Sequence, residues 1–232
     1  MKHMQRGFTL VEIAIVLVII GLLLGGILKG QELITNAKVR NVADQQNAIK
    51  AAIYAFQDRF RALPGDYSQA SVNIPNTSFT AASTGNSKID TVAESVQAWH
   101  QLAAAGFISC SACAADPGTA AAATQSNSMT NAYNGIMLLT YDPNYYSVSP
   151  PTAVNNLKSG NLIPSNILAE VDRKIDDGDP TTGTMRFSNA QVQPTATTDT
   201  DCATAATAGP PSVPGAWAAA SPNTNCGAAN IL

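Results

Sequence analysis

The chain has 232 residues, a formal net charge of −3 and only 12% charged residues. Because the composition has no basic excess, nucleic acid is not an expected partner. The sequence holds no GxSxG, HExxH, P-loop or Rossmann glycine pattern, and His3 and His100 are its two histidines, which argues against an enzyme and gives no reason to expect a cofactor.

The N-terminal segment combines a short basic leader with a long apolar run. Lys2 and Arg6 precede the run, and Glu12 is the only ionisable residue between Phe8 and Leu28. A helical run of this length extends about 30 Å, which is the thickness of the hydrocarbon core of a bilayer. The pattern therefore predicts a transmembrane helix over residues 8–28.

The position of Gly7 distinguishes this segment from an ordinary secretory signal. Such a signal is cut after its apolar core, next to small residues. Here Gly7 precedes the apolar run, so a cut between Gly7 and Phe8 removes the basic leader and keeps the helix. The register of residues from Gly7 to Glu12, in a match that extends from Lys2 to about Leu24, resembles the type IV prepilin signal.

The resemblance implies roles for three residues. In type IV pilins a prepilin peptidase cuts after the glycine and N-methylates the new first residue, which here is Phe8, and Glu12 matches the family's acidic assembly residue. A carboxylate within a membrane span costs several kcal/mol unless it has a partner. We expect Glu12 to pair with the Phe8 amine of a neighbouring subunit; the alternative is that Glu12 lies near the headgroups and only snorkels there.

A second helical pattern follows the apolar run. Its apolar residues recur at three, four or seven positions, which places them on one face of an amphipathic helix. They are Val42, Ile49, Ile53, Phe56, Phe60 and Leu63. Because Pro64 disfavours helix at Leu63, the helix should end near Ala62. The sequence thus predicts one helix of about 80 Å, apolar over residues 8–28 and amphipathic over 29–63.

Four glycines interrupt the apolar half of this helix at a cost of about 1 kcal/mol each relative to alanine. They are Gly21, Gly25, Gly26 and Gly30. Small residues let membrane helices pack closely, which is the interpretation we favour. The alternative is that they let the helix loosen when it leaves the bilayer; many type IV pilins have a proline in this region, and this chain does not.

Residues 64–232 predict one head domain with two helices and three strands. The helices are Thr91–Ala105, which begins with a Thr-x-x-Glu capping box, and Ser165–Ile175. The strands are Tyr133–Tyr141 and Tyr145–Ser149, on either side of an Asp-Pro-Asn turn, and Thr184–Val192. About 170 residues suffice for a head with its own hydrophobic core.

Leu63-Pro64-Gly65-Asp66, directly after the long helix, resembles a motif in a group of pilin-like proteins. The further residues that carry this resemblance are Glu94, Trp99, Leu102, Ala105-Gly106-Phe107 and Ile175-Asp176-Asp177-Gly178. The resemblance supports a pilin-type subunit without specifying the filament. We expect Asp66 to accept hydrogen bonds from nearby backbone N–H groups and to cap the turn between helix and head; the alternative is a contact with a ligand.

Acidic residues gather around Gly178. Asp176, Asp177 and Asp179, with Asp172 one helical turn earlier, are candidate oxygen ligands for calcium outside the cell, and some pseudopilins bind calcium. The spacing lacks the alternating oxygens of an EF-hand loop. Acids at a helix end followed by Gly-Asp-Pro are also common in solvated turns, and this is the interpretation we favour.

Four cysteines lie in the expected head. Cys110, Cys113, Cys202 and Cys226 should be oxidised in an exported protein, and four cysteines allow three connectivities. We favour Cys110–Cys113 and Cys202–Cys226, because the latter closes a loop rich in Pro, Ala and Thr, and pilins often staple a C-terminal loop in this way. An alternative for the CxxC, a redox motif or half a zinc site, lacks a second CxxC.

Together these observations predict an α+β protein with a type IV pilin fold: a leader at residues 1–7, a membrane and assembly helix at 8–28, its amphipathic continuation at 29–63, and a small antiparallel-sheet head at 64–232. The resemblance implies a subunit of a helical homo-oligomeric filament, which a prepilin peptidase processes and an inner-membrane assembly platform extrudes. The precursor would lie in the inner membrane and the product on the cell surface. The alternatives are a periplasmic pseudopilin of a type II secretion system and a minor pilin that binds a surface or DNA.

Overall fold

The computed structural model describes residues 10–77, 83–118, 122–189, 200–206 and 214–232. It divides into two compact units, Met1–Lys38 and Val39–Leu232. Helix α1 (Leu10–Phe60) contributes its N-terminal half to the first unit and its C-terminal half to the second. The unit that contains the head therefore begins within this helix, before the Leu-Pro-Gly-Asp turn.

Helix α1 is a single uninterrupted helix of 51 residues, as the sequence predicted. It ends at Phe60, slightly before the expected end near Ala62, because Arg61 takes a left-handed backbone conformation (φ 55°). The C-terminal half of α1 buries a single face, at the spacing of three, four and seven that the sequence shows. The buried residues are Val39, Val42, Ala43, Gln46, Ile49, Ala52, Ile53 and Phe56.

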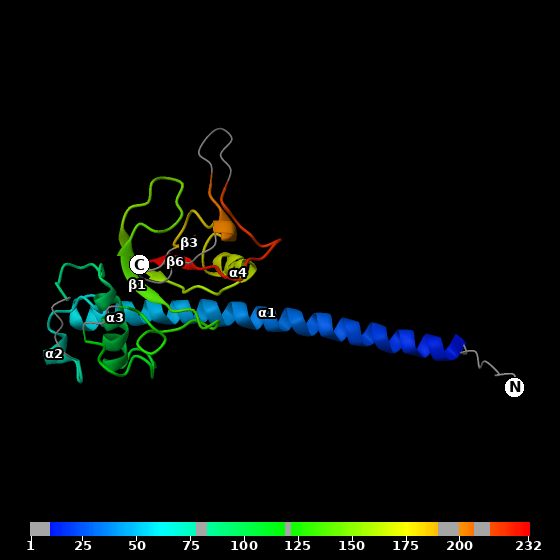
Figure 1. Ribbon diagram of the computed structural model, residues 1–232, viewed down its shortest axis with the longest axis horizontal. Coiled ribbons are helices and arrows are strands. Elements are labelled where there is room, and N and C mark those ends of the chain that lie inside the picture. The colour runs from blue at the N-terminus through cyan, green and yellow to red at the C-terminus, as the bar shows by residue number, and fades with distance from the viewer. Residues whose placement is uncertain (1–9, 78–82, 119–121, 190–199, 207–213) are drawn as a thin grey trace. The chain divides into compact units, whose positions relative to one another are not determined.

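The main sheet has four antiparallel strands in the order β1-β2-β6-β3. The strands are β1 (Leu138–Asp142), β2 (Val154–Lys158), β3 (Met185–Phe187) and β6 (Ala228–Ile231). Figure 1 shows β1, β3 and β6 in the head, with α4 (Ser165–Ile175) close to β6. The architecture is an α+β, pilin-like fold, as expected.

Two of the three predicted strands need correction. The segment Tyr133–Tyr141 is a strand only from Leu138, and Tyr145–Ser149 is not a strand. The partner of β1 is β2, which lies beyond the proline pair at positions 150 and 151. Tyr145 instead donates its hydroxyl to the carbonyl oxygen of Thr152 (2.6 Å). Tyr145 is buried and Tyr146 packs on the core, so aromatic side chains hold this loop against the head. The prolines at 143, 150 and 151, on either side of the loop, lack the N–H donors that a strand needs.

The third predicted strand, Thr184–Val192, corresponds to the shorter β3, and its residues 190–192 lie outside the described residues. Short strands were also missed near the C-terminal end. β4 (Ala203–Thr204) and β5 (Ala216–Trp217) form a second sheet, and η1 (Thr200–Cys202) precedes them. These segments are rich in Ala and Thr and carry little periodic signal.

Both predicted head helices are confirmed. α3 (Val92–Ala104) begins with the expected capping box: the N–H of Glu94 donates to Thr91 Oγ1, and the N–H of Thr91 donates to Glu94 Oε2, both at 3.1 Å. α4 has the predicted limits. A further short helix, α2 (Ala70–Asn73), was not predicted.

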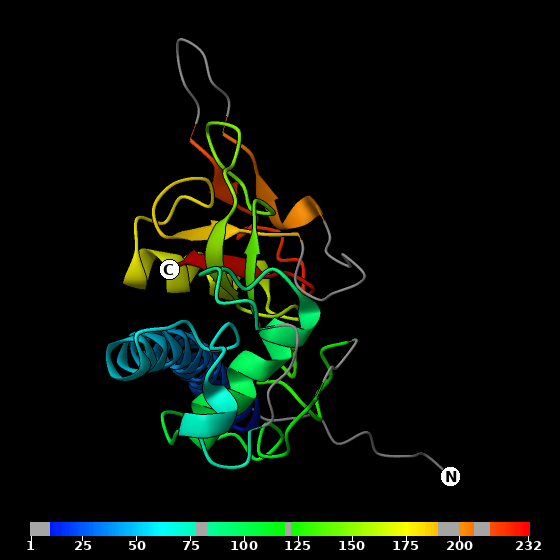
Figure 2. The ribbon, with the colours of Figure 1, turned by 90° about the vertical axis from the view of Figure 1, so that its left-hand side faces the viewer.

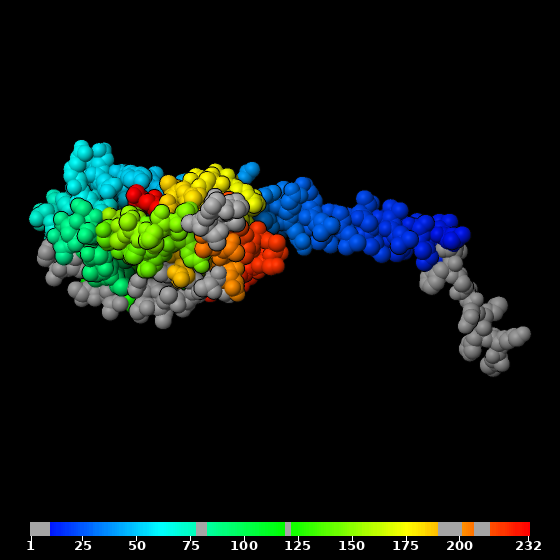
Figure 3. Space-filling model, turned by 90° about the horizontal axis from the view of Figure 1, so that it is seen from above, coloured from blue at the N-terminus to red at the C-terminus, as the bar shows by residue number. Residues whose placement is uncertain are grey.

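The core joins these elements in two large clusters. The first packs Ile49–Phe56 of α1 against α3, β1 and β2. The second packs Val39, Val42 and Ala43 of α1 with α4, β3 and β6. In Figure 2, α3 (green) lies beside the cyan segment of α1. Trp99 of α3 is fully buried, and its Nε1 donates to the carbonyl oxygen of Met137 (3.1 Å). The C-terminal residues, red in Figure 3, lie beside the cyan segment of α1, where Leu232 packs on the first cluster.

A buried ion pair connects β1 and β2. Lys158 is fully buried, and its Nζ donates to Asp142 Oδ1 (2.9 Å), to the carbonyl oxygen of Asn144 (2.9 Å) and to Ser188 Oγ (3.1 Å). Burial lowers the pKa of Lys158, and the neighbouring carboxylate of Asp142 opposes that shift. Three acceptors satisfy the ammonium, so the charge is tolerated in the core.

Candidate functional site

The N-terminal half of α1 exposes its apolar side chains in the described part of the chain. Every large apolar side chain from Leu10 to Leu28 is exposed. Among the described residues, α1 is the one helix long and apolar enough to cross a membrane. This half of the helix can therefore be covered by lipid or by other protein helices.

Charged groups bound this apolar surface at both ends. Glu12 is exposed in the first turn of α1, where the unpaired N–H groups of a helix favour negative charge. Lys29 and Glu32 form an ion pair at 2.7 Å on the surface just beyond Leu28. Gly7 and Phe8 lie outside the described residues, so cleavage and methylation there stay predictions.

The four glycines of the apolar half of α1 have open space where a side chain would lie. At Gly21, Gly25, Gly26 and Gly30, an added Cβ would meet no atom of the described residues within 4 Å. Contacts among the described residues thus do not require glycine at these four positions. Backbone exposed at small residues is the surface that neighbouring helices approach most closely.

The turn after α1 is built by the Leu-Pro-Gly-Asp motif. Gly65 has a φ of 89° and donates its N–H to Gln101 Oε1 (2.7 Å). Asp66 is buried and accepts from the backbone N–H groups of Gly85 and Ser87, both at 2.6 Å. Asp66 therefore binds backbone donors, as expected, although these come from a segment about twenty residues later rather than from the turn itself.

The acidic segment after α4 folds into a tight loop. Asp176 Oδ2 accepts from the N–H groups of Thr184 (2.5 Å) and Met185 (2.8 Å), and Asp177 Oδ2 accepts from Thr182 Oγ1 (2.6 Å). One oxygen each of Asp172, Asp176 and Asp177 lies within 4.8 Å of the others. This described group contains Asp172 and not Asp179.

Asp179 has a different role from that considered in the sequence. Its Oδ1 accepts from the N–H (2.9 Å) and the Oγ1 (2.6 Å) of Thr181, so it caps the loop. Burial raises the pKa of Asp172 to about 6, and the carboxylates of Asp177 and Asp176 add to the shift. Hydrogen bonds from the side chain of Trp217 and from the backbone of Gly178 oppose it.

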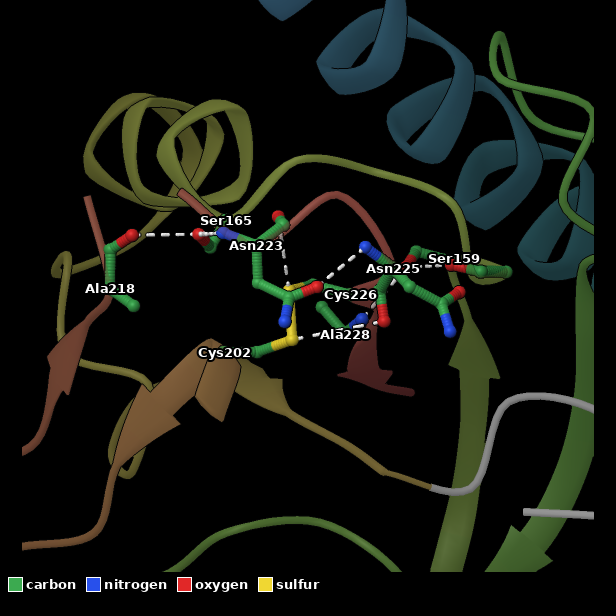
Figure 4. Close-up of a disulfide and its surroundings, with 9 residues drawn as sticks. Ser159, Ser165, Cys202, Ala218, Asn223, Asn225, Cys226 and Ala228 are labelled. Carbon is green, nitrogen blue, oxygen red and sulfur yellow. Dashed lines mark hydrogen bonds between the residues drawn. A yellow bond between two sulfur atoms is a disulfide. The ribbon is translucent and has the colours of Figure 1, made fainter. Parts of the chain in front are cut away.

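The structure contains the two disulfides that the sequence favoured, Cys110–Cys113 and Cys202–Cys226. Figure 4 shows the second one beside the start of α4. Ser165 Oγ donates to the carbonyl oxygen of Ala218 (2.7 Å) and accepts from the N–H of Asn223 (3.0 Å). The loop that the Cys202–Cys226 disulfide closes is thus also hydrogen-bonded to the first residue of α4.

Loss of the Cys202–Cys226 disulfide should destabilise the head. Its partners are 24 positions apart, and closing such a loop stabilises the folded state by about 3.5 kcal/mol in the chain-entropy model. The double variant Cys202→Ser/Cys226→Ser should therefore unfold at lower guanidinium concentration, measured by tryptophan fluorescence of the detergent-solubilised full chain. Cys110→Ser/Cys113→Ser, with partners 3 positions apart, is the control and should lose only about 2 kcal/mol. Equal losses would contradict the loop-length argument.

The CxxC disulfide lies next to the only histidine that follows the leader. His100 is buried; its Nδ1 lies 2.9 Å from the carbonyl oxygen of Cys113, and its Nε2 lies 3.0 Å from that of Asn76. Nε2 also lies 3.3 Å from Thr77 Oγ1, and because a neutral imidazole has one N–H, one ring nitrogen donates to a carbonyl while the other can accept from a hydroxyl. This geometry gives His100 a structural role, linking α3 to two loops.

These features define a class of protein: an apolar N-terminal helix of membrane-spanning length continues into an α+β head with a pilin-like fold. Residues 2–28 match the family model for the prokaryotic N-terminal methylation motif. The chain thus carries the motif typical of type IV pilins and pseudopilins, which indicates a structural protein that is made as a membrane precursor, processed by a peptidase and assembled into a filament. No curated protein and no solved structure matched the chain.

Proposed function

We propose that this protein is a pilin, the structural subunit of an extracellular type IV pilus-like filament. One observation carries the proposal: the methylation motif at residues 2–28 leads directly into a helix that continues without a break to Phe60. A secretory signal peptide is removed together with its apolar segment, so it does not need to continue as a helix into the mature protein. A subunit that keeps its membrane helix after cleavage does need a helix that connects the membrane segment to the head.

The proposed processing assigns a role to each segment. A prepilin peptidase removes residues 1–7 by cutting after Gly7, and methylates the amine of Phe8. Residues 8–28 hold the subunit in the inner membrane and then form the filament core. Residues 29–63 connect this segment to the head at 64–232. The amine of Phe8 and the carboxylate of Glu12 are then the charged groups of the apolar segment.

The energetics of assembly follow from this arrangement. Lipid tails are as apolar as leucine side chains, so transfer of the exposed apolar face from lipid to a filament core gains little from the hydrophobic effect. The specificity of contacts between subunits must therefore come from polar pairing and close packing. Glu12 and the Phe8 amine of a neighbour provide the polar pair, and the open surface at the four glycines allows the close packing.

Mass spectrometry of sheared surface filaments tests the proposal. We expect abundant recovery of this chain, with an N-terminal peptide that begins at N-methylated Phe8. A processed form confined to the membrane fraction would instead favour a pseudopilin of a type II secretion system or a minor subunit. An uncut bond between Gly7 and Phe8 would refute both forms of the proposal.

A further inference from the structure

A cavity of about 160 Å³ lies in the head, between the start of α3 and one face of β1. Leu138, Thr140 and Asp142 alternate along β1, so their side chains share that face of the sheet. On α3, Val92 and Ser95 line the cavity and are neighbours on the helix surface, because they are three positions apart. Two regular elements that pack against each other therefore form most of its wall.

Two buried polar side chains in this wall each have an oxygen without a hydrogen-bond partner. Ser95 is 4% exposed and Asp142 is 8% exposed. In the described part of the chain, no group bonds Ser95 Oγ or Asp142 Oδ2. A serine within a helix often donates to the carbonyl four residues earlier, but here the carbonyl oxygen of Thr91 accepts from the N–H of Ser95 (3.1 Å) and not from its hydroxyl. Such buried oxygens are unfavourable unless water or a ligand bonds them.

The size and the wall of the cavity suit one small ring with hydroxyl groups. A cavity of about 150 Å³ holds a single six-membered ring, whereas pockets for drug-sized ligands measure about 300–1,000 Å³. Val92 and Leu138 give the wall an apolar part. Ser95, Thr140 and Asp142 give it oxygens that can bond hydroxyl groups. A monosaccharide combines an apolar C–H face with several hydroxyls and matches both parts.

The charges around the cavity favour a neutral ligand over an ion. Asp142 Oδ1 accepts from Lys158 Nζ (2.9 Å), so the charge of this carboxylate already has a partner. Its Oδ2 therefore needs a hydrogen-bond donor rather than a second cation. The carboxylate of Asp90, which also lines the cavity, disfavours an anion. A sugar hydroxyl can donate to Asp142 without adding charge.

We propose that this cavity binds a monosaccharide. Asp90 and Thr91 line the cavity and are exposed, so a ligand can enter from solvent. Water fills the cavity until the sugar displaces it. The inference goes beyond the filament function and does not depend on it, because every lining residue belongs to the unit Val39–Leu232.

Ligand-observed saturation-transfer NMR on the full chain tests the proposal. The chain is kept in micelles of a detergent whose headgroup contains no sugar, and the probes are D-glucose, D-galactose, D-mannose and N-acetyl-D-glucosamine. We expect at least one of the four to give a saturable signal with a Kd of about 1 mM or tighter, as suits a ligand of this size.

Ser95→Ala and Thr140→Val locate the binding. We expect each to weaken binding of that sugar about three- to tenfold, which is the loss of one hydrogen bond. Ser95→Ala should not lower the melting temperature, because no described group bonds the hydroxyl that it removes. The control is Ser71→Ala, at an exposed serine of α2 outside the cavity wall, which should bind as the unaltered chain does.

Two results would overturn the proposal. If none of the four sugars gives a saturable signal, the cavity holds water only. If a sugar binds but Ser95→Ala and Thr140→Val bind it as tightly as Ser71→Ala does, the sugar binds elsewhere on the chain.

Discussion

Replacement of Glu12 by alanine should leave membrane insertion and cleavage intact and reduce recovered filament about tenfold or more. Insertion should not suffer, because alanine is cheaper than a carboxylate in hydrocarbon. Assembly should suffer, because the Phe8 amine of each neighbouring subunit loses its counter-charge. A loss of only about 1.4 kcal/mol per contact already corresponds to a factor of ten. Immunoblots of sheared and membrane fractions measure the effect.

Glu32→Ala is the matched control for this experiment. Glu32 lies on the same helix, also carries one negative charge and pairs with Lys29 on the surface beyond the apolar run. Exposed pairs of this kind contribute little, so filament yield should stay near normal. Normal yield from Glu12→Ala would reject the docking role and favour an acid that merely reaches the headgroups.

Asp142→Ala should be among the most destabilising single changes in the head. It leaves the ammonium of Lys158 buried with only the neutral acceptors Asn144 and Ser188. Breaking a buried ion pair from one side typically costs about 3–5 kcal/mol. For a unit of this size the melting temperature should fall by about 10 °C, measured by tryptophan fluorescence of the full chain in detergent.

The double variant Asp142→Leu/Lys158→Met separates the charge effect from loss of packing. Because an apolar pair of similar volume often replaces a buried ion pair at little cost, the double variant should recover most of the stability lost in Asp142→Ala. Glu170→Ala, which breaks the exposed pair with Arg173, should change stability by less than about 1 kcal/mol. A double variant as unstable as the single one would show that shape, not charge, dominates the site.

The elements with strong local signals could be predicted from the sequence. The long helix and α4 have clear helical periodicity, and α3 has a capping box whose two hydrogen bonds are present. The order of residues around Gly7 indicated the methylation motif, which matches residues 2–28. In each case neighbouring residues alone carry the information.

The strands of the sheet were predicted less accurately, because their pairing depends on residues that are distant in the sequence. Tyr145–Ser149 has the composition of a strand, yet β1 pairs with Val154–Lys158, whose two asparagines and lysine form a weak strand pattern. Lys158 is buried because Asp142, Asn144 and Ser188 converge on it from other segments. The hydrogen bond from Trp217 to Asp172 is likewise a property of the assembled structure, since it connects β5 to α4.

Strand β6 has a kinetic consequence. It inserts between β2 and β3, which do not pair with each other, and it follows β2 by about seventy residues. Until Ala228–Ile231 has crossed the membrane, both neighbours expose open backbone edges of the kind that promote aggregation. Contacts this distant in sequence slow folding. A subunit waiting in the membrane is therefore most vulnerable to misassembly and proteolysis in the interval between export of β3 and export of β6.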